Sequence, residues 1–158
     1  MTRKKKVLFV CLGNICRSPS AEAVFRHLLD QRGLSEDFTV DSAGTSAYHA
    51  GEPADKRMRK HAAKRGIQLT SISRKFRISD FDQFDHIIAM DHDNMSELKK
   101  MARNENDLGK LTMMTDYSKK YNMDHVPDPY FGGEEGFEQV LDLLEDAGQG
   151  LVETLTEG

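Results

Sequence analysis

The sequence is poor in cysteine, in long apolar runs and in excess positive charge. Its 158 residues include two cysteines, too few for a disulfide-stapled scaffold, and free cysteines favour a reducing compartment. No apolar stretch is long enough to span a bilayer. A formal net charge of −4 gives no general attraction to nucleic acid or to anionic membranes. We therefore expect a cytoplasmic protein that binds neither nucleic acid nor membrane.

Internal repeats, low-complexity tracts and linkers rich in Pro, Gly or Ser are also absent from the sequence. The length, with 38% apolar and 30% charged residues, suits a single domain over residues 1–158. The basic start Lys4-Lys5-Lys6 precedes a short apolar run, in the order of a secretory signal. Gly13 and Asn14 then follow in place of a small-residue cleavage site, so we do not expect a cleaved signal.

Apolar periodicity predicts strands that alternate with helices, which implies a parallel sheet with right-handed crossovers. The expected strands cover residues 7–10, 38–43, 84–90 and 111–115. Residues with good capping side chains precede three of the expected helices: Ser18, Asp55 and Asp91. Sites form beyond the carboxyl ends of parallel strands, so we expect one sheet edge to gather four residues that lie there: Cys11, Ser42, Asp91 and Asp116.

The most informative segment joins the first expected strand to the first expected helix. It is a candidate phosphate-binding loop made of Cys11 and the residues that follow: Leu12, Gly13, Asn14, Ile15, Cys16, Arg17 and Ser18. Backbone N–H groups of such a loop, together with a helix N-terminus, bind a tetrahedral oxyanion. Cys11 at its floor is expected to be a thiolate, the form in which cysteine is a nucleophile. The planar fork of Arg17 can bind two phosphoryl oxygens at once.

The bare spacing C-x5-R arises often by chance, and a buried cysteine with an arginine in a surface salt bridge would also produce it. The preceding strand, Gly13 and Asn14 within the loop, and a Ser-Pro start to the next helix favour function. For Cys16 two interpretations stay open. It is a small buried hydrophobe, or it is a redox partner that traps an oxidised Cys11 as a disulfide.

Departure of an alkoxide or phenoxide needs a proton, and Asp128 is the best candidate donor. Pro127 and Pro129 flank it and stiffen the backbone, as expected where a catalytic side chain must be aimed. General acid catalysis is typically worth ~10²–10⁴ in rate. Pro-Asp-Pro is also ordinary turn chemistry, and the candidate phosphate-binding loop is what favours the catalytic interpretation.

Four motifs, in order along nearly the whole chain, resemble signatures of the low-molecular-weight protein tyrosine phosphatases. They are residues 10–18, Asp41-Ser42-Ala43-Gly44, Ala89-Met90-Asp91 and Asp128-Pro129-Tyr130. The resemblance implies an α/β fold of three layers, α/β/α, with a four-stranded parallel sheet. It also implies hydrolysis of phosphotyrosine in proteins, and of aryl phosphate monoesters, through a phosphocysteine, with no metal and no other cofactor. Tyrosine-phosphorylated proteins would be the substrates.

The resemblance also assigns roles to individual residues. Cys11 would be the nucleophile, Arg17 would bind the phosphoryl group, and Asp128 would act first as acid and then as base. Three residues would hold the loop in shape: Asn14, Ser18 and Ser42. Another three would line a slot for an aromatic leaving group: Leu12, Tyr48 and Tyr130. The chain departs from many members at Ser71, where they carry histidine, and from some eukaryotic members at Phe131, where they carry tyrosine.

Two other clusters have simpler interpretations. A basic helix is expected to present a solvated face, with attraction of acidic partners as the alternative; it contains Lys56, Arg57, Arg59, Lys60, Lys64 and Arg65. The run Asp91-His92-Asp93-Asn94 resembles metal ligands, but adjacent helical side chains point in different directions, so capping by Asp91 is preferred.

Two rival functions share the candidate phosphate-binding loop. One branch of the same fold reduces arsenate with thioredoxin, but that chemistry uses cysteines outside the loop, and this chain has only Cys11 and Cys16. A non-enzymatic protein could bind phosphotyrosine without cleaving it, although intact Cys11, Arg17 and Asp128 oppose that interpretation.

Overall fold

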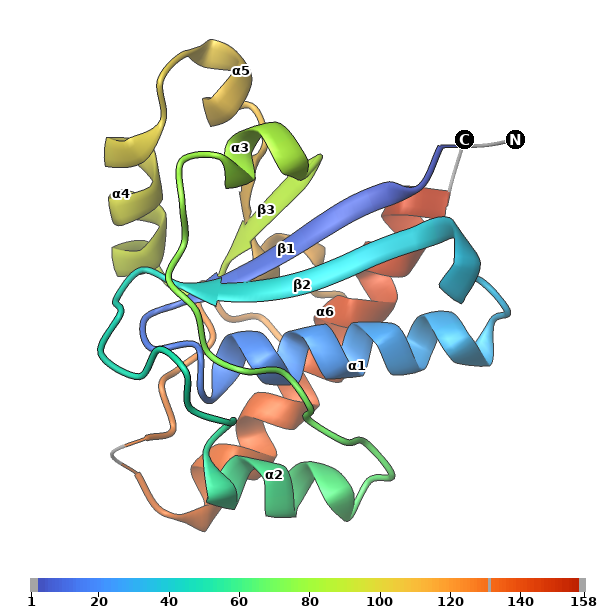
Figure 1. The fold of residues 1–158 in the computed structure, drawn as a ribbon. Coiled ribbons are helices and arrows are strands. Elements are labelled where there is room, and N and C mark those ends of the chain that lie inside the picture. Colours follow the sequence, from blue (N-terminus) through green and yellow to red (C-terminus); the bar gives the residue numbers. More distant parts are fainter. Residues whose placement is uncertain (1–2, 131, 157–158) are drawn as a thin grey trace.

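The computed structural model describes residues 3–130 and 132–156, and these form a parallel sheet between two layers of helices (Figure 1). The sheet has four strands in the order β2-β1-β3-β4, and every neighbouring pair is parallel. The strands are β1 (Lys5–Cys11), β2 (Phe38–Gly44), β3 (His86–Ala89) and β4 (Leu111–Met113). This is the α/β/α architecture with a four-stranded parallel sheet that the family resemblance implies, and the parallel sheet is the one that the sequence pattern predicts.

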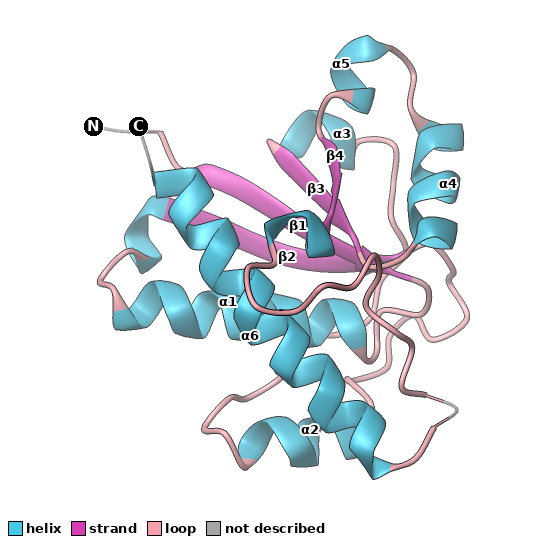
Figure 2. Cartoon of the chain, turned by 180° about the vertical axis from the view of Figure 1, so that it is seen from behind, coloured by secondary structure: helices cyan, strands magenta, loops and turns pink. Residues whose placement is uncertain are grey.

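Helices cover both faces of the sheet, as Figures 1 and 2 show from opposite sides. On one face lie α1 (Arg17–Gln31) and α6 (Glu134–Thr156), with α2 (Lys56–Ala63) against α6. On the other face lie α3 (Asp80–Gln83), α4 (His92–Met101) and α5 (Glu105–Leu108). Two short 3₁₀ turns complete the described part of the chain: η1 (Ser35–Asp37) and η2 (Met114–Tyr117).

The apolar run of β1 explains how the two layers share one sheet. Successive side chains of a strand point to opposite faces, so a strand covered on both sides must be apolar throughout. Val7, Phe9 and Cys11 are buried on the α1 and α6 side. Leu8 and Val10 are buried with the residues of the α3 and α4 side. β1 is therefore fixed from both faces, and its carboxyl end is a rigid support for the loop that follows.

Two predicted helix caps are confirmed and one is wrong. The Asp55 carboxylate accepts hydrogen bonds from the second and third residues of α2, and Asp91 forms a capping box with Asn94 at the start of α4. Ser18 does not cap α1, which begins at Arg17 with Cys16 in the capping position. Its hydroxyl instead bonds to groups around Cys11, so a buried polar network takes the place of the cap.

The third and fourth strands are shorter than predicted. β3 loses the first two residues and the last of the expected range 84–90, and β4 ends at Met113 rather than residue 115. The Asp116 carboxylate accepts a hydrogen bond from the Met113 N–H, which turns the chain into η2. Asp116 therefore shapes a turn.

Within the described residues, no helix combines the length and apolar character needed to cross a membrane.

Candidate active site

The segment between β1 and α1 forms a tight, largely buried loop. Cys11 is the last residue of β1 and is 2% exposed. Asn14 has a φ of 56°, the left-handed conformation that asparagine tolerates better than most residues. The loop ends where α1 begins, at Arg17. The carboxyl end of a central strand and the N-terminus of a long helix thus meet at one turn, an arrangement suited to anions.

A buried network of polar side chains lies beneath the loop. The Asn14 side-chain amide donates to Ser18 Oγ at 2.7 Å, and its oxygen accepts from the Arg74 N–H at 3.0 Å. Ser18 Oγ lies 3.1 Å from Cys11 Sγ and 3.3 Å from the Ala43 carbonyl oxygen. Because Asn14 donates to Ser18, the serine proton is available for the sulfur or for that carbonyl. A hydroxyl aimed at the sulfur stabilises a thiolate.

Two neighbouring segments hold the loop from outside. The N–H groups of Thr45 and Ser46 donate to the carbonyls of Cys11 and Leu12, both at 2.9 Å. Ser73 Oγ donates to the Gly13 carbonyl, also at 2.9 Å. Ser73 and Arg74 come two and three residues after Ser71, so the segment that follows Ser71 supports the loop.

Ser42 supports the loop less directly than the resemblance implies. Its hydroxyl donates to Glu22 Oε1 at 2.7 Å, so it fixes the first turns of α1 against β2. Burial raises the pKa of Glu22, against the opposing effects of the Ser42 hydrogen bond and of Arg26. Ser42 therefore acts on the helix that follows the loop.

Gly44, at the end of β2, lets the loop approach the sheet. A Cβ at this position would lie 2.7 Å from the Leu12 carbonyl oxygen and 3.2 Å from the Asn14 nitrogen, both backbone atoms. We expect Gly44→Ala to displace the loop, to cost about 1–3 kcal/mol of unfolding free energy, and to raise KM for aryl phosphates. Thermal melts and steady-state kinetics measure this. Gly133→Ala is the control, since its Cβ would meet nothing within 4 Å; equal effects at both positions would contradict the prediction.

Arg17 is buried, 2% exposed, and is held in one orientation. Its Nη1 donates to Asp91 Oδ2 at 2.5 Å and to the Val126 carbonyl at 3.1 Å. Burial lowers the pKa of the Arg17 guanidinium, but the neighbouring Cys11 and Asp91 more than offset this and raise it. The sequence predicted Asp91 as a helix cap at this sheet edge, but not as a partner of Arg17. Its Oδ1 does cap α4, at 2.7 Å from the Asn94 nitrogen, and Oδ2 orients Arg17.

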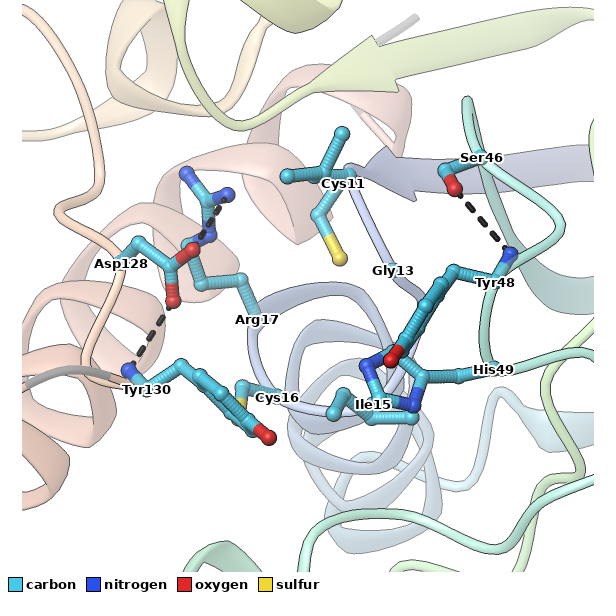
Figure 3. Close-up of a pocket in the computed structure, with 11 residues that line it drawn as sticks. Cys11, Gly13, Ile15, Cys16, Arg17, Ser46, Tyr48, His49, Asp128 and Tyr130 are labelled. Carbon is cyan, nitrogen blue, oxygen red and sulfur yellow. Dashed lines mark hydrogen bonds and ion pairs between the residues drawn. The ribbon is translucent and has the colours of Figure 1, made fainter.

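Asp128 faces the loop from a separate segment. Its Oδ2 lies 3.6 Å from Arg17 Nη2, and its side chain is one-third exposed. Its Oδ1 accepts from the Tyr130 N–H at 3.0 Å (Figure 3). The turn chemistry of the Pro-Asp-Pro sequence is thus present, and the same carboxylate reaches the cavity beside Cys11 and Arg17.

These groups surround one cavity of about 480 Å³. In Figure 3, Cys11 and Arg17 lie at one end, with Asp128 and Tyr130 on one side and Tyr48 and His49 on the other. The lining residues are Cys11, Leu12, Gly13, Ile15, Cys16, Arg17, Ser46, Tyr48, His49, Asp128 and Tyr130. All three predicted slot residues, Leu12, Tyr48 and Tyr130, are among them. The predicted supporting residues Asn14, Ser18 and Ser42 lie behind this lining.

His49 is a wall residue that sequence reasoning missed. Its ring packs edge-on against Tyr48, with centroids 4.8 Å apart, and lies 6.0 Å from the Tyr130 ring. Its Nδ1 lies 3.2 Å from both carboxylate oxygens of Glu52. The sequence carries no signal for this position, because a lone histidine without metal spacing is indistinguishable from an ordinary surface residue.

Cys16 is a buried free thiol. Both cysteines are free, and burial, followed by the charges of Asp55, Cys11 and Asp128, raises the pKa of Cys16. Cys16 is therefore a neutral thiol at neutral pH.

Across residues 3–130 and 132–156, no cluster of three or more His, Cys, Asp or Glu side chains could hold a metal ion.

Comparison with known proteins identifies the family. A model of the low molecular weight phosphotyrosine protein phosphatases matches residues 6–158. The chain belongs to this family. A low molecular weight protein-tyrosine-phosphatase of Streptomyces coelicolor is 41% identical over 155 residues, 96% of this chain and 94% of that protein. The human low molecular weight phosphotyrosine protein phosphatase is 40% identical over 137 residues, 86% of each chain.

A solved structure agrees with this membership of the low molecular weight phosphatases. The crystal structure of a protein tyrosine phosphatase from Entamoeba histolytica superposes with a TM-score of 0.94 at 49% identity, covering 96% of this chain and 97% of the other. The predicted family resemblance is therefore confirmed. Phe131, the second position at which the sequence departs from some members, lies outside the described residues.

Proposed function

We propose that the protein hydrolyses phosphotyrosine in proteins, and aryl phosphate monoesters, through a phosphocysteine on Cys11. Proteins of this family are phosphotyrosine phosphatases. One observation carries the assignment of roles. Cys11 and Arg17, from one loop, and Asp128, from a segment more than a hundred residues later, line the same cavity.

In the first step, the Cys11 thiolate attacks the phosphorus and forms an S–P bond. The loop N–H groups and Arg17 hold the three non-bridging oxygens, whose charge is spread further in the transition state. Because Asp91 and the Val126 carbonyl engage Nη1, the other N–H groups of Arg17 are available to these oxygens. The P–O bond to the aryl group breaks, and protonated Asp128 gives its proton to the departing oxygen.

In the second step, water attacks the phosphorus of the phosphocysteine. Asp128, now a carboxylate, takes a proton from that water, the S–P bond breaks, and Cys11 leaves as the thiolate. Ser18 and the main-chain dipoles stabilise the returning anion. Inorganic phosphate is then released, and the protein's own residues supply every proton transfer.

The walls of the cavity account for the preference for an aromatic leaving group. Leu12 is 51% exposed and Tyr48 is 84% exposed, so both present apolar surface to an incoming ring. Tyr130 faces Tyr48 across the cavity (Figure 3). A flat slot that ends at an anion site fits a phosphorylated tyrosine, whose ring separates its phosphate from the backbone by several ångströms.

Phosphate release from a phosphotyrosine peptide, with a chelator present, tests this function. We expect turnover that the chelator does not change, and much slower release from the matching phosphoserine peptide. Arsenate reduction coupled to thioredoxin would support the rival reductase. Stable binding of the phosphotyrosine peptide with no phosphate release would support a binding protein and would contradict the proposal.

We also propose that Cys16 is the redox partner of Cys11. A sulfenic acid on Cys11 would condense with the Cys16 thiol, forming a disulfide and losing water. After brief peroxide treatment, we expect a reductant to restore activity in the wild type, and about tenfold less activity in Cys16→Ser, whose Cys11 oxidises further. Equal recovery in both proteins would leave Cys16 as a small buried hydrophobe. Residual activity and peptide mass spectrometry give the readout.

Tyrosine-phosphorylated proteins of the cytoplasm are the proposed substrates. The free thiols in the cavity require a reducing compartment to remain active, which supports this location. The formal net charge of −4 gives no general attraction to nucleic acid or to an anionic membrane.

A further inference from the structure

We propose that Arg57 is a positioning residue, which holds the segment carrying Asp128 against the loop that carries Cys11. This inference rests on the proposed function. Arg57 lies in the first turn of α2, outside the residues that line the cavity. It belongs to the basic helix for which the sequence predicts a solvated face, with attraction of acidic partners as the alternative.

Arg57 makes three contacts on the side of the acid. Its Nη2 donates to the Tyr130 carbonyl at 3.0 Å. Its guanidinium carbon lies 5.3 Å from the centre of the Tyr130 ring and 4.9 Å from that of Phe137 in α6. Tyr130 in turn donates its N–H to Asp128 Oδ1 at 3.0 Å. The Arg57 guanidinium therefore fixes Tyr130, whose N–H in turn holds the Asp128 carboxylate.

On the side of the loop, Arg57 is held by Asp55. Oδ2 of Asp55 lies 3.1 Å from Arg57 Nη2, and Oδ1 lies 3.3 Å from Arg57 Nε, a two-pronged pair. The Asp55 N–H donates to the Ile15 carbonyl, within the loop, at 2.8 Å. A continuous path of contacts thus runs from the loop through Asp55 and Arg57 to the acid segment.

Asp55 is suited to this position because it stays ionised. Its side chain is 10% exposed, and burial raises its pKa. Hydrogen bonds from Arg57 and from the Met58 N–H outweigh burial and lower the pKa overall. The anchor is therefore a charged carboxylate over the neutral range, and its partner must be a cation with several N–H groups.

The acid segment needs such external support. Residues 127–129 belong to no helix or strand, and Pro127 and Pro129 have no N–H to donate. Lysine could replace Arg57 only in part, because a single ammonium cannot span Asp55 and the Tyr130 carbonyl while stacking on two rings. The Arg57 side chain is nevertheless 47% exposed, so its removal should disturb geometry far more than folding.

The choice of leaving group distinguishes a positioning role of Arg57 from a general loss of structure. Departure of phenolate needs a proton from Asp128, whereas departure of p-nitrophenolate hardly does. In the full-length protein, we expect Arg57→Ala to lower kcat/KM for phenyl phosphate about tenfold, part of the ~10²–10⁴ that a general acid supplies. For p-nitrophenyl phosphate, kcat/KM should fall by about twofold or less, and inhibition by inorganic phosphate should not change. Lys56→Ala, an exposed cation of the same helix, is the control and should match the wild type.

A double substitution tests the route through Asp128. In the Asp128→Ala background, Arg57→Ala should change kcat/KM for phenyl phosphate by less than about twofold, because no acid remains to be positioned. An equal tenfold loss in both backgrounds, or for both leaving groups, would overturn the role. If Arg57→Ala melts early, Arg57→Lys serves instead and should show the same selectivity at a smaller loss. A wild type that hydrolyses neither ester would refute the proposed function, an outcome distinct from these.

Discussion

Cys11→Ser should abolish turnover of phosphotyrosine and of p-nitrophenyl phosphate, with a loss on the order of 10⁴-fold or more. This corresponds to about 5 kcal/mol or more of transition-state stabilisation. A serine hydroxyl is almost wholly protonated at neutral pH, so the hydrogen bond to Ser18 and the loop dipoles would no longer support an anionic nucleophile. Initial rates at high enzyme concentration measure the loss.

The same variant should keep its affinity for anions. The loop N–H groups and Arg17 are unchanged, and a negative charge near the bound phosphate is removed. Inorganic phosphate should therefore bind Cys11→Ser at least as tightly as the wild type, by calorimetry. Cys16→Ser is the matched control and should keep most of its turnover under reducing conditions. Undiminished hydrolysis by Cys11→Ser would contradict the nucleophile assignment.

Asp128→Ala should lose ~10²–10⁴ in kcat/KM for phenyl phosphate and far less for p-nitrophenyl phosphate. With the better leaving group, the first step proceeds without the acid, while hydrolysis of the phosphocysteine lacks its base. The phosphoenzyme should accumulate, so stopped-flow traces should show a burst of nitrophenolate close to one equivalent of enzyme, followed by slow release.

Asp128→Asn distinguishes catalysis from turn formation. Asparagine keeps an oxygen that can accept the Tyr130 N–H, so the turn can be preserved, but its amide cannot donate and recover the proton. We expect Asp128→Asn to be as impaired as Asp128→Ala on phenyl phosphate. Near-wild-type activity in Asp128→Asn would show that Asp128 forms the turn and is not the acid.

The parts of the site that the sequence predicted are those encoded locally. The apolar run of β1, followed by a loop with Gly13 and Asn14 and then by a helix, places Cys11 and Arg17 within a few residues of each other. Parallel pairing then fixes which sheet edge they occupy. The flanking prolines indicated Asp128 as the acid, although no local pattern predicts that its segment lies against the loop.

The parts that the sequence did not predict depend on contacts between distant residues. Asp91 bonds to Arg17 across 74 residues, and Arg57 reaches Tyr130 across 73. Local rules can predict one interaction of a side chain, such as the helix cap formed by Asp91. A carboxylate has two oxygens, and the second oxygen of Asp91 bonds to Arg17. The predicted Ser18 cap was wrong for a different reason, because nearby buried groups of the loop, Cys11 and Asn14, bond to its hydroxyl.

The basic helix mostly presents the solvated face that charge patterning predicts, since Lys56, Arg57, Arg59, Lys60 and Lys64 are exposed and Arg65 is half-buried. Exposed cations at helical spacing usually do face solvent. In this protein Arg65 pairs with Glu138, Asp142 and Glu145 along α6, and Arg57 bridges to Tyr130. The Arg65 pairs depend on α6 packing beside α2, an arrangement that charge patterning does not predict.

Trapping the covalent intermediate tests the central claim most directly. Asp128→Ala is mixed with p-nitrophenyl phosphate and quenched during the burst, and its peptides are analysed by mass spectrometry. The account predicts one phosphoryl group on the sulfur of Cys11 and none on any other side chain. A phosphoryl group on a different residue, or steady turnover with Cys11 never modified, would contradict it.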